Sequence, residues 1–370
     1  MQMEKNSPRT KWLIFRNVVW VCLVIVATFA YWEFGVRVLT KVAFPRLRSD
    51  PTVGSIHVPN YLGNVWNEES KKNRLIRTNN IGYIGNDIHL EKASNTIRIA
   101  IIGDSVVEAV QVDYFNNFTS VLENTLNTTN TCEGRNFEVL NFGVQGMGTF
   151  LEYQTFKKKI SPFQPDYVFL FFNEDYANDM LKLGLDPEHF SEEKPFGIKS
   201  FLWKFELTKF VFNKLQKDPG FISMLQTLGV LKKTTNPNDS DTTNNSSTTP
   251  ETEQSYQWTF NLLSRLNKKV SEQQSTLIVF VYPKEKDYET HDGWKSDENI
   301  VKLIEYLDRS EIQYINPSYD LENAHTVAGE CLTYGCHTHL TEKGHQVVAS
   351  ILHRYLNNKI IPRLDCTTIQ

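Results

Sequence analysis

The feature that most constrains the fold is the run Thr96–Ser105 (TIRIAIIGDS), in which apolar, largely β-branched residues end in Gly-Asp-Ser. A stretch compatible with a helix follows, from Asn116 to Leu126. A buried strand, a tight turn and a helix in that order predict the opening unit of a parallel α/β sheet. Ligands of such sheets bind beyond the carboxyl ends of the strands, so Ser105 lies where a nucleophile is expected. The alternative is that Gly-Asp-Ser is only a turn, because all three residue types favour turns.

Four further apolar runs continue the pattern of core strands: Phe137–Leu140, Tyr167–Phe172, Thr276–Tyr282 and Ile312–Ile315. Helical patterns follow at Trp258–Val270, Ile300–Leu307 and Glu342–Leu356, the last with Thr341 as its N-cap. Strands that alternate with helices pair in parallel through right-handed crossovers. The sequence therefore predicts a three-layer α/β/α sandwich around a central parallel sheet of about five strands, of the flavodoxin-like kind.

One transmembrane helix is predicted ahead of this domain. Residues 1–11 form a polar tail, and residues 12–36 are apolar with few exceptions, long enough to span a bilayer. The competing interpretations are a cleaved signal peptide, with Thr28-Phe29-Ala30 as the cleavage site, and a buried core helix. Basic residues on the two sides nearly balance, so the positive-inside rule barely decides the orientation. We expect residues 1–11 in the cytoplasm, and Arg48 to Gln370 outside it.

The rest of the chain divides by composition. Residues 50–95 are expected to be a lead-in of irregular chain and short edge strands before the domain at 96–360. Aromatic residues at helical spacing predict a helical insertion over 181–233. Residues 234–254 are rich in Thr, Asn and Ser and almost without apolar residues, which predicts a disordered loop that interrupts the one domain.

Charge and cysteine content exclude some functions. The net charge is −4, so no basic face suggests a nucleic-acid partner. Of the five cysteines, Cys22 lies in the membrane segment, and four lie in the body, an even number as disulfides require. The pairings we expect are Cys331–Cys336 and Cys132–Cys366. A zinc site at Cys336, His337 and His339 is the alternative, but no second ligand cluster accompanies these residues, so no metal and no cofactor is expected.

Four sequence blocks carry the chemistry, and they occur in the order Ser, Gly, Asn, His. They are Gly103–Ser105, Asn141–Gly146, Asn173 after its strand, and His337–His345 before the last helix. In this order and spacing the blocks resemble those of the SGNH (GDSL) hydrolases. Asn79–Tyr83 is similar to a segment found ahead of the first block in membrane-anchored bacterial members. The resemblance covers roughly residues 77–179 and 258–356.

The resemblance implies a Ser–His site. Ser105 would be the nucleophile, and His339 the base that takes its proton. The oxyanion donors would be the backbone N–H groups of Ser105 and Gly146 and the side-chain amide of Asn173, with Asn178 as a nearby alternative. His345 is expected to pack inside the helix as an ordinary histidine.

One residue of the family's pattern is missing. The family places an Asp two or three residues before the catalytic His, where this chain has His337 and Cys336. Loss of the orienting acid costs about 10⁴-fold in kcat in a serine protease. A disulfide between Cys331 and Cys336 could hold the His339 backbone instead, or the acid could come from elsewhere in the chain.

Two hypotheses for the function follow from these residues. The first is a membrane-anchored, extracytoplasmic serine esterase or acyl hydrolase that acts on acylated envelope carbohydrate or lipid; an acyltransferase that uses the same residues is a variant of it. The second is a catalytically weak or inactive relative that binds glycans or envelope partners.

Overall fold

The structure, a computed structural model, describes residues 8–41, 47–50, 52–129, 132, 134–173, 250–283 and 293–364. The chain divides into two units, one of residues 1–49 and 195–245 and the other of residues 50–194 and 246–370. In the first unit, α1 (Pro8–Lys41) is a single long helix, and β1 (Leu47–Asp50) lies at the boundary with the second. Each unit is described separately below.

Helix α1 contains the predicted apolar span. Residues Trp12–Val36 have a mean hydropathy of 2.2, and by length and composition they could cross a membrane. Twenty-five helical residues extend about 37 Å, more than the roughly 30 Å of a hydrocarbon core. The same properties fit a signal sequence, whereas a buried core helix does not fit, because residues 12–32 of this span are all exposed.

The second unit is built on the predicted parallel sheet. Its strands are β5 (Thr96–Gly103), β6 (Asn136–Gly143), β7 (Tyr167–Phe172), β8 (Thr276–Val281) and β9 (Gln313–Ile315). Their order in the sheet is β6-β5-β7-β8-β9, and every neighbouring pair is parallel. Counted along the chain this is the order 2-1-3-4-5 of flavodoxin-like sheets, in which the direction of winding reverses between the first and third strands. The predicted fold class is confirmed.

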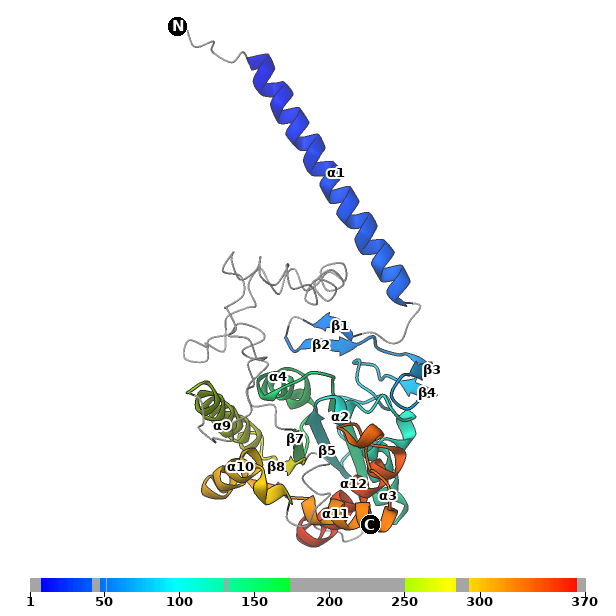
Figure 1. The fold of residues 1–370 in the computed structure, drawn as a ribbon, viewed down its shortest axis with the longest axis vertical. Helices are drawn as coiled ribbons and strands as arrows, with labels where there is room; N and C mark the ends of the chain where they lie inside the picture. Colours follow the sequence, from blue (N-terminus) through cyan, green and yellow to red (C-terminus); the bar gives the residue numbers. More distant parts are fainter. Residues whose placement is uncertain are drawn as a thin grey trace, which may run out of the picture. The chain divides into compact units, whose positions relative to one another are not determined.

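Helices cover both faces of this sheet (Figure 1). On one face, α3 (Phe118–Thr128), α11 (Ser318–Ala328) and α12 (Glu342–Tyr355) pack on alternate residues of the strands, such as Ile99 and Ile101. Toward the other face lie α4 (Thr149–Thr155), α9 (Pro250–Ser271) and α10 (Glu298–Arg309). Every residue of β5 is buried, which explains why the strand is apolar except at Thr96 and Arg98.

Short helical segments complete the second unit. The 3₁₀ turns are η1 (Tyr114–Asn116), η3 (Ser161–Phe163), η5 (Gly293–Ser296), η6 (Tyr334–Cys336) and η8 (Ile361–Arg363). The π-helical turns are η2 (Phe156–Ile160) and η7 (Leu356–Ile360).

A row of stacked rings joins two helices to the sheet. Phe118 of α3 stacks on Phe171 of β7 at 4.7 Å, and Phe171 stacks on Phe280 of β8 at 4.3 Å. The ring of His345 in α12 also stacks on Phe118, at 5.7 Å, and its Nδ1 accepts a hydrogen bond from the Phe118 N–H. His345 is fully buried, as predicted, and only its neutral form can accept this bond at Nδ1.

The lead-in contains short strands. After β2 (Gly54–His57), strands β3 (Leu62–Asn67) and β4 (Lys72–Arg77) form an antiparallel hairpin in a sheet of their own. The Asn79–Tyr83 segment then forms a tight turn, because Asn79 Oδ1 accepts from the N–H groups of Ile81 and Tyr83. Gly82 has φ +92°, and a Cβ there would lie 2.4 Å from the His57 carbonyl oxygen, so this turn needs glycine.

Some helices differ from the prediction. Helix α9 begins at Pro250, so residues 250–254 of the predicted disordered loop are helical, consistent with proline at a first helical position. The remaining residues 234–249 and the predicted helical insertion at 181–233 lie outside the described residues. Helices α4 and α11 were not predicted. Helix α4 has only seven residues, and its polar residues Glu152 and Gln154 are buried while Leu151 is partly exposed, so its sequence shows no amphipathic helical period.

The burial of His345 predicts a pH-dependent stability. Burial, and to a lesser degree the charge of His339, lowers the pKa of His345 from 6.5 to about 3. Between these two pKa values, His345 is protonated in the unfolded chain and neutral in the folded protein. Because protonation favours the unfolded chain, the free energy of unfolding decreases as the pH falls from about 6.5 toward 3. The decrease due to His345 is about 1.4 kcal/mol per pH unit, and above about pH 6.5 this residue causes none.

Chemical denaturation of the wild type, His345→Gln and His89→Gln between pH 7 and 4 tests this expectation. His345→Gln should show a shallower loss of unfolding free energy than the wild type, whereas His89→Gln, which changes an exposed histidine, should follow the wild type. Parallel curves for wild type and His345→Gln would contradict the assignment.

Candidate active site

Ser105 lies in the turn directly after the central strand β5. It begins the short helix α2 (Ser105–Glu108), and Asp104 caps this helix by accepting a hydrogen bond from the Val106 N–H at 2.9 Å. The helix ends at Ala109, whose left-handed backbone lets its N–H bond the Ser105 carbonyl. A sharp strand–turn–helix connection thus exposes the Ser105 side chain at the carboxyl edge of the sheet.

The structure brings His339 against this serine. The Nε2 atom of His339 lies 2.8 Å from Ser105 Oγ, a hydrogen-bonding distance across 234 residues of sequence. His339 is in the loop before α12, which begins at the predicted N-cap Thr341. The two residues that the sequence analysis selected for a Ser–His pair are therefore in direct contact.

Backbone bonds hold the His339 loop against the segment that precedes it. The Tyr334 N–H donates to the His339 carbonyl at 2.8 Å, and the Thr341 N–H donates to the Leu332 carbonyl at 2.8 Å. From the sheet side, the Tyr282 hydroxyl donates to the Thr338 carbonyl at 3.0 Å. Because residues on both sides of His339 are bonded, the backbone of this loop is held in place.

The predicted disulfide Cys331–Cys336 is confirmed, and it closes a loop around the segment that pairs with His339. Cys132 is also disulfide-bonded, although its predicted partner Cys366 lies outside the described residues. Since the Cys336 sulfur is bonded to Cys331, it is not a thiolate ligand for the alternative zinc site. No metal-ligating group of three side chains occurs in the described parts of the chain.

A carboxylate that the sequence analysis did not single out faces the other ring nitrogen of His339. Glu69 Oε2 lies 2.7 Å from His339 Nδ1, and the Glu69 and His339 side chains are 32% and 24% exposed. Glu69 belongs to the turn between β3 and β4, far from positions 336 and 337, where the family resemblance places the acid. Of the two alternatives for the missing acid, the structure thus offers a carboxylate from elsewhere in the chain.

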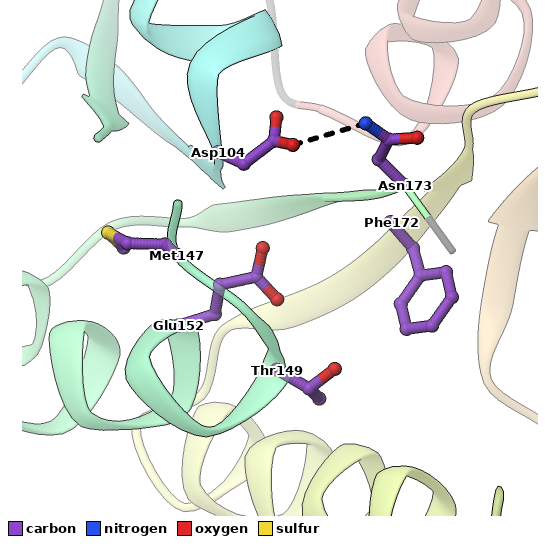
Figure 2. Close-up of a pocket in the computed structure, with 6 residues that line it drawn as sticks. All are labelled: Asp104, Met147, Thr149, Glu152, Phe172 and Asn173. Carbon is purple, nitrogen blue, oxygen red and sulfur yellow. Dashed lines mark hydrogen bonds between the residues drawn. The ribbon is translucent and has the colours of Figure 1, made fainter. Parts of the chain in front are cut away.

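The loops after β6 and β7 reach the same edge of the sheet as Ser105. Asn173 follows β7 directly, and its Nδ2 donates to Asp104 Oδ2 at 3.1 Å. Figure 2 shows these two side chains pointing toward each other at a pocket that Met147 and Glu152 also line. Gly146, next to Met147, is exposed and has φ +75°, which favours glycine. Asn178 lies outside the described residues.

Comparisons with known proteins give a distant similarity only. No protein-family profile matches the chain, and a search among curated proteins found no match. Solved structures similar to it include TesA, with a TM-score of 0.40, 10% identity, and coverage of 71% of this chain and 99% of that one. The acetyl xylan esterase AlAXEase has a TM-score of 0.41 and 12% identity, and the match covers 70% of this chain and 100% of the esterase. A member of the lipolytic protein G-D-S-L family from Veillonella parvula DSM 2008 has a TM-score of 0.39 and 14% identity, and the match covers 72% of this chain and 99% of that protein. An activity is therefore inferred below from the site geometry alone.

The Cys331–Cys336 disulfide predicts a measurable loss of stability when it is removed. Closing so short a loop restricts the unfolded chain, which corresponds to about 2 kcal/mol. Urea denaturation of Cys331→Ser/Cys336→Ser should show this decrease in unfolding free energy, and Cys22→Ser, which changes a free exposed cysteine, serves as the control. Equal stability of the double variant and the wild type would show that the crosslink does not restrict the unfolded chain.

Proposed function

We propose that the chain is a serine esterase or acyl hydrolase in which Ser105 is the nucleophile and His339 the general base. The observation that carries this proposal is the 2.8 Å contact between Ser105 Oγ and His339 Nε2 at the carboxyl edge of the sheet. A serine hydroxyl is a weak nucleophile until an adjacent base accepts its proton. The contact also lies where β5 and β7 meet, the switch point at which such sheets bind ligands.

The reaction follows from this pair in two steps. As Ser105 Oγ attacks the ester carbonyl carbon, its proton moves to His339 Nε2, and a tetrahedral oxyanion forms. The imidazolium then returns the proton to the departing alcohol oxygen, which leaves an acyl ester on Ser105. Water attacks this ester with His339 again as the base, so that the carboxylic acid and free Ser105 are regenerated.

Three neutral donors are proposed for the oxyanion: the backbone N–H groups of Ser105 and Gly146, and the Asn173 amide. The contact of Asn173 with Asp104 supports this role, because it orients the amide while using one of its two N–H hydrogens. The second hydrogen remains for the oxyanion. At Gly146 the absence of a side chain leaves room for substrate, since no atom of the described residues lies within 4 Å of where a Cβ would be.

The proposed location is the outer side of a membrane, with α1 as a single-pass anchor. The apolar span Trp12–Val36 supports anchoring. The disulfides at Cys132 and Cys331–Cys336 support an oxidising compartment, because such bonds are rare in the cytosol. An enzyme held there would meet acylated carbohydrate or lipid of the cell envelope, which we propose as its substrate class.

The same acyl-serine intermediate would serve an acyltransferase, with a sugar hydroxyl in place of water. Hydrolysis is preferred because Ser105 is partly open to solvent in the described residues. The alternative of an inactive binding protein is less well supported, because such a protein has no need of a base hydrogen-bonded to Ser105. Incubation with an acyl donor and a sugar acceptor would distinguish transfer from hydrolysis.

The activity proposal predicts loss of turnover when the nucleophile is removed. Ser105→Ala should abolish hydrolysis of p-nitrophenyl acetate and labelling by a fluorophosphonate probe, because no oxygen remains to be acylated. Asn173→Ala should retain labelling but lower kcat by about 10²–10³-fold, as expected for the loss of one oxyanion donor. Hydrolysis by Ser105→Ala at the wild-type rate would exclude the proposed function.

The proposed topology predicts that the body of the protein is accessible from outside the cytoplasm. Protease added to intact spheroplasts should digest residues after Arg48 and leave a membrane-embedded fragment that contains α1. A cytoplasmic marker protein must stay intact in the same sample. Full protection of the body until the membrane is lysed would contradict the topology.

A further inference from the structure

Glu69 provides the carboxylate next to His339 that the sequence directly before His339 lacks. We infer that Glu69 is the acid that orients His339, and that Arg74 holds the β3–β4 hairpin in the position where Glu69 can do so. The inference rests on the proposed function of Ser105 and His339. It assigns to the lead-in hairpin a positioning role in the site of a domain whose sheet begins only at Thr96.

The need for an acceptor at His339 Nδ1 follows from the role of Nε2. To accept the Ser105 proton, Nε2 must be unprotonated, so the proton of the neutral ring resides on Nδ1 and is donated from there. Glu69 Oε2 lies 2.7 Å away and accepts this bond. Its negative charge also stabilises the imidazolium that forms when Ser105 loses its proton. Glu69 acts through His339, so it is a positioning residue.

The turn geometry directs Glu69 to this position. Asn67 Oδ1 accepts hydrogen bonds from the N–H groups of Glu69 and Ser70, at 3.1 and 2.8 Å, and closes the turn. The adjacent Glu68 has other partners: its carboxylate accepts a hydrogen bond from Trp66 Nε1 and pairs with Lys71 on the exposed surface. Two neighbouring glutamates in one turn therefore have separate partners, and one of them faces the active site.

Arg74 of β4 ties the hairpin to the loop that carries His339. Its side chain is only 5% exposed, and its guanidinium pairs with Glu342 in the first turn of α12. It also donates to the Tyr334 hydroxyl at 2.8 Å, and the Tyr334 backbone N–H in turn bonds the His339 carbonyl. Arg74 thus bonds residues on both sides of His339 in sequence, and this fixes the hairpin relative to the ring that Glu69 contacts.

A second set of bonds ties the hairpin to the chain that follows the nucleophile. Asp113 Oδ1 accepts from the Leu75 N–H at 2.6 Å, and Asn67 Nδ2 donates to the Val110 carbonyl at 3.4 Å. The hairpin therefore contacts the segments that carry Ser105 and His339. These contacts hold Glu69 where its carboxylate can bond the His339 ring that contacts Ser105.

Steady-state kinetics of Glu69→Gln test the inference, with Glu68→Gln as the matched control. Glu69→Gln should lower kcat by about 10²–10⁴-fold with KM changed less than about threefold, because Gln offers no charge to the imidazolium. Glu68→Gln should leave kcat unchanged, and Glu69→Asp should recover part of the loss. Wild-type kcat in Glu69→Gln, while Ser105→Ala is inactive, would overturn the inference and leave the proposed function intact.

The role of Arg74 is tested by a double-mutant cycle. If Arg74→Met acts by displacing Glu69, it should lower kcat by about tenfold or more in the wild type but have little further effect in Glu69→Gln. Tyr334→Phe, which removes one hydroxyl, should give a smaller effect with the same dependence on Glu69. An equal loss in both backgrounds would overturn the role of Arg74, since it would show a general loss of structure.

Discussion

The hydrogen-bonded line from Glu69 through His339 to Ser105 is the interaction on which the account of this protein depends. It joins three segments separated by 270 and 234 residues, and only the folded chain brings them together. Each segment is held by its own local structure: a side-chain-closed turn for Glu69, a disulfide-flanked loop for His339, and a capped strand–helix turn for Ser105. Small displacements of any one segment would break the line, because hydrogen bonds weaken steeply with distance and angle.

The sheet supplies the fixed frame for this line. Ser105 and Asn173 follow the adjacent strands β5 and β7, and the parallel register aligns their carboxyl ends. The stacked rings of Phe118, Phe171 and Phe280 fill the core between the sheet and α3, and His345 extends the stack into α12. Helix α12 starts three residues after His339, so the same packing that buries His345 also fixes the end of the loop that carries His339.

The sequence predicted the parts of the site that follow regular elements. Ser105 and Asn173 follow apolar strands, and His339 precedes an amphipathic helix with a recognisable N-cap, so local pattern indicates their places in the fold. Their assignment to one site came from the resemblance of the four sequence blocks. Glu69 could not, because Asn67–Lys71 has the composition of an ordinary solvated turn, and nothing local distinguishes Glu69 from Glu68. The partner of Glu69 is set by tertiary contacts of Arg74 and Asp113. Likewise, α4 is only seven residues long and buries its polar residues Glu152 and Gln154, so its sequence does not show the polar and apolar faces of an amphipathic helix.

The most direct test is a crystal structure of the protein after reaction with a phosphonate ester inhibitor. The account predicts phosphorus bonded to Ser105 Oγ and a phosphonyl oxygen about 2.7–3.1 Å from the N–H donors of Ser105, Gly146 and Asn173. It also predicts that Glu69 remains on His339 Nδ1. An adduct on any other residue, or a Glu69 carboxylate turned away from the His339 ring, would contradict the account.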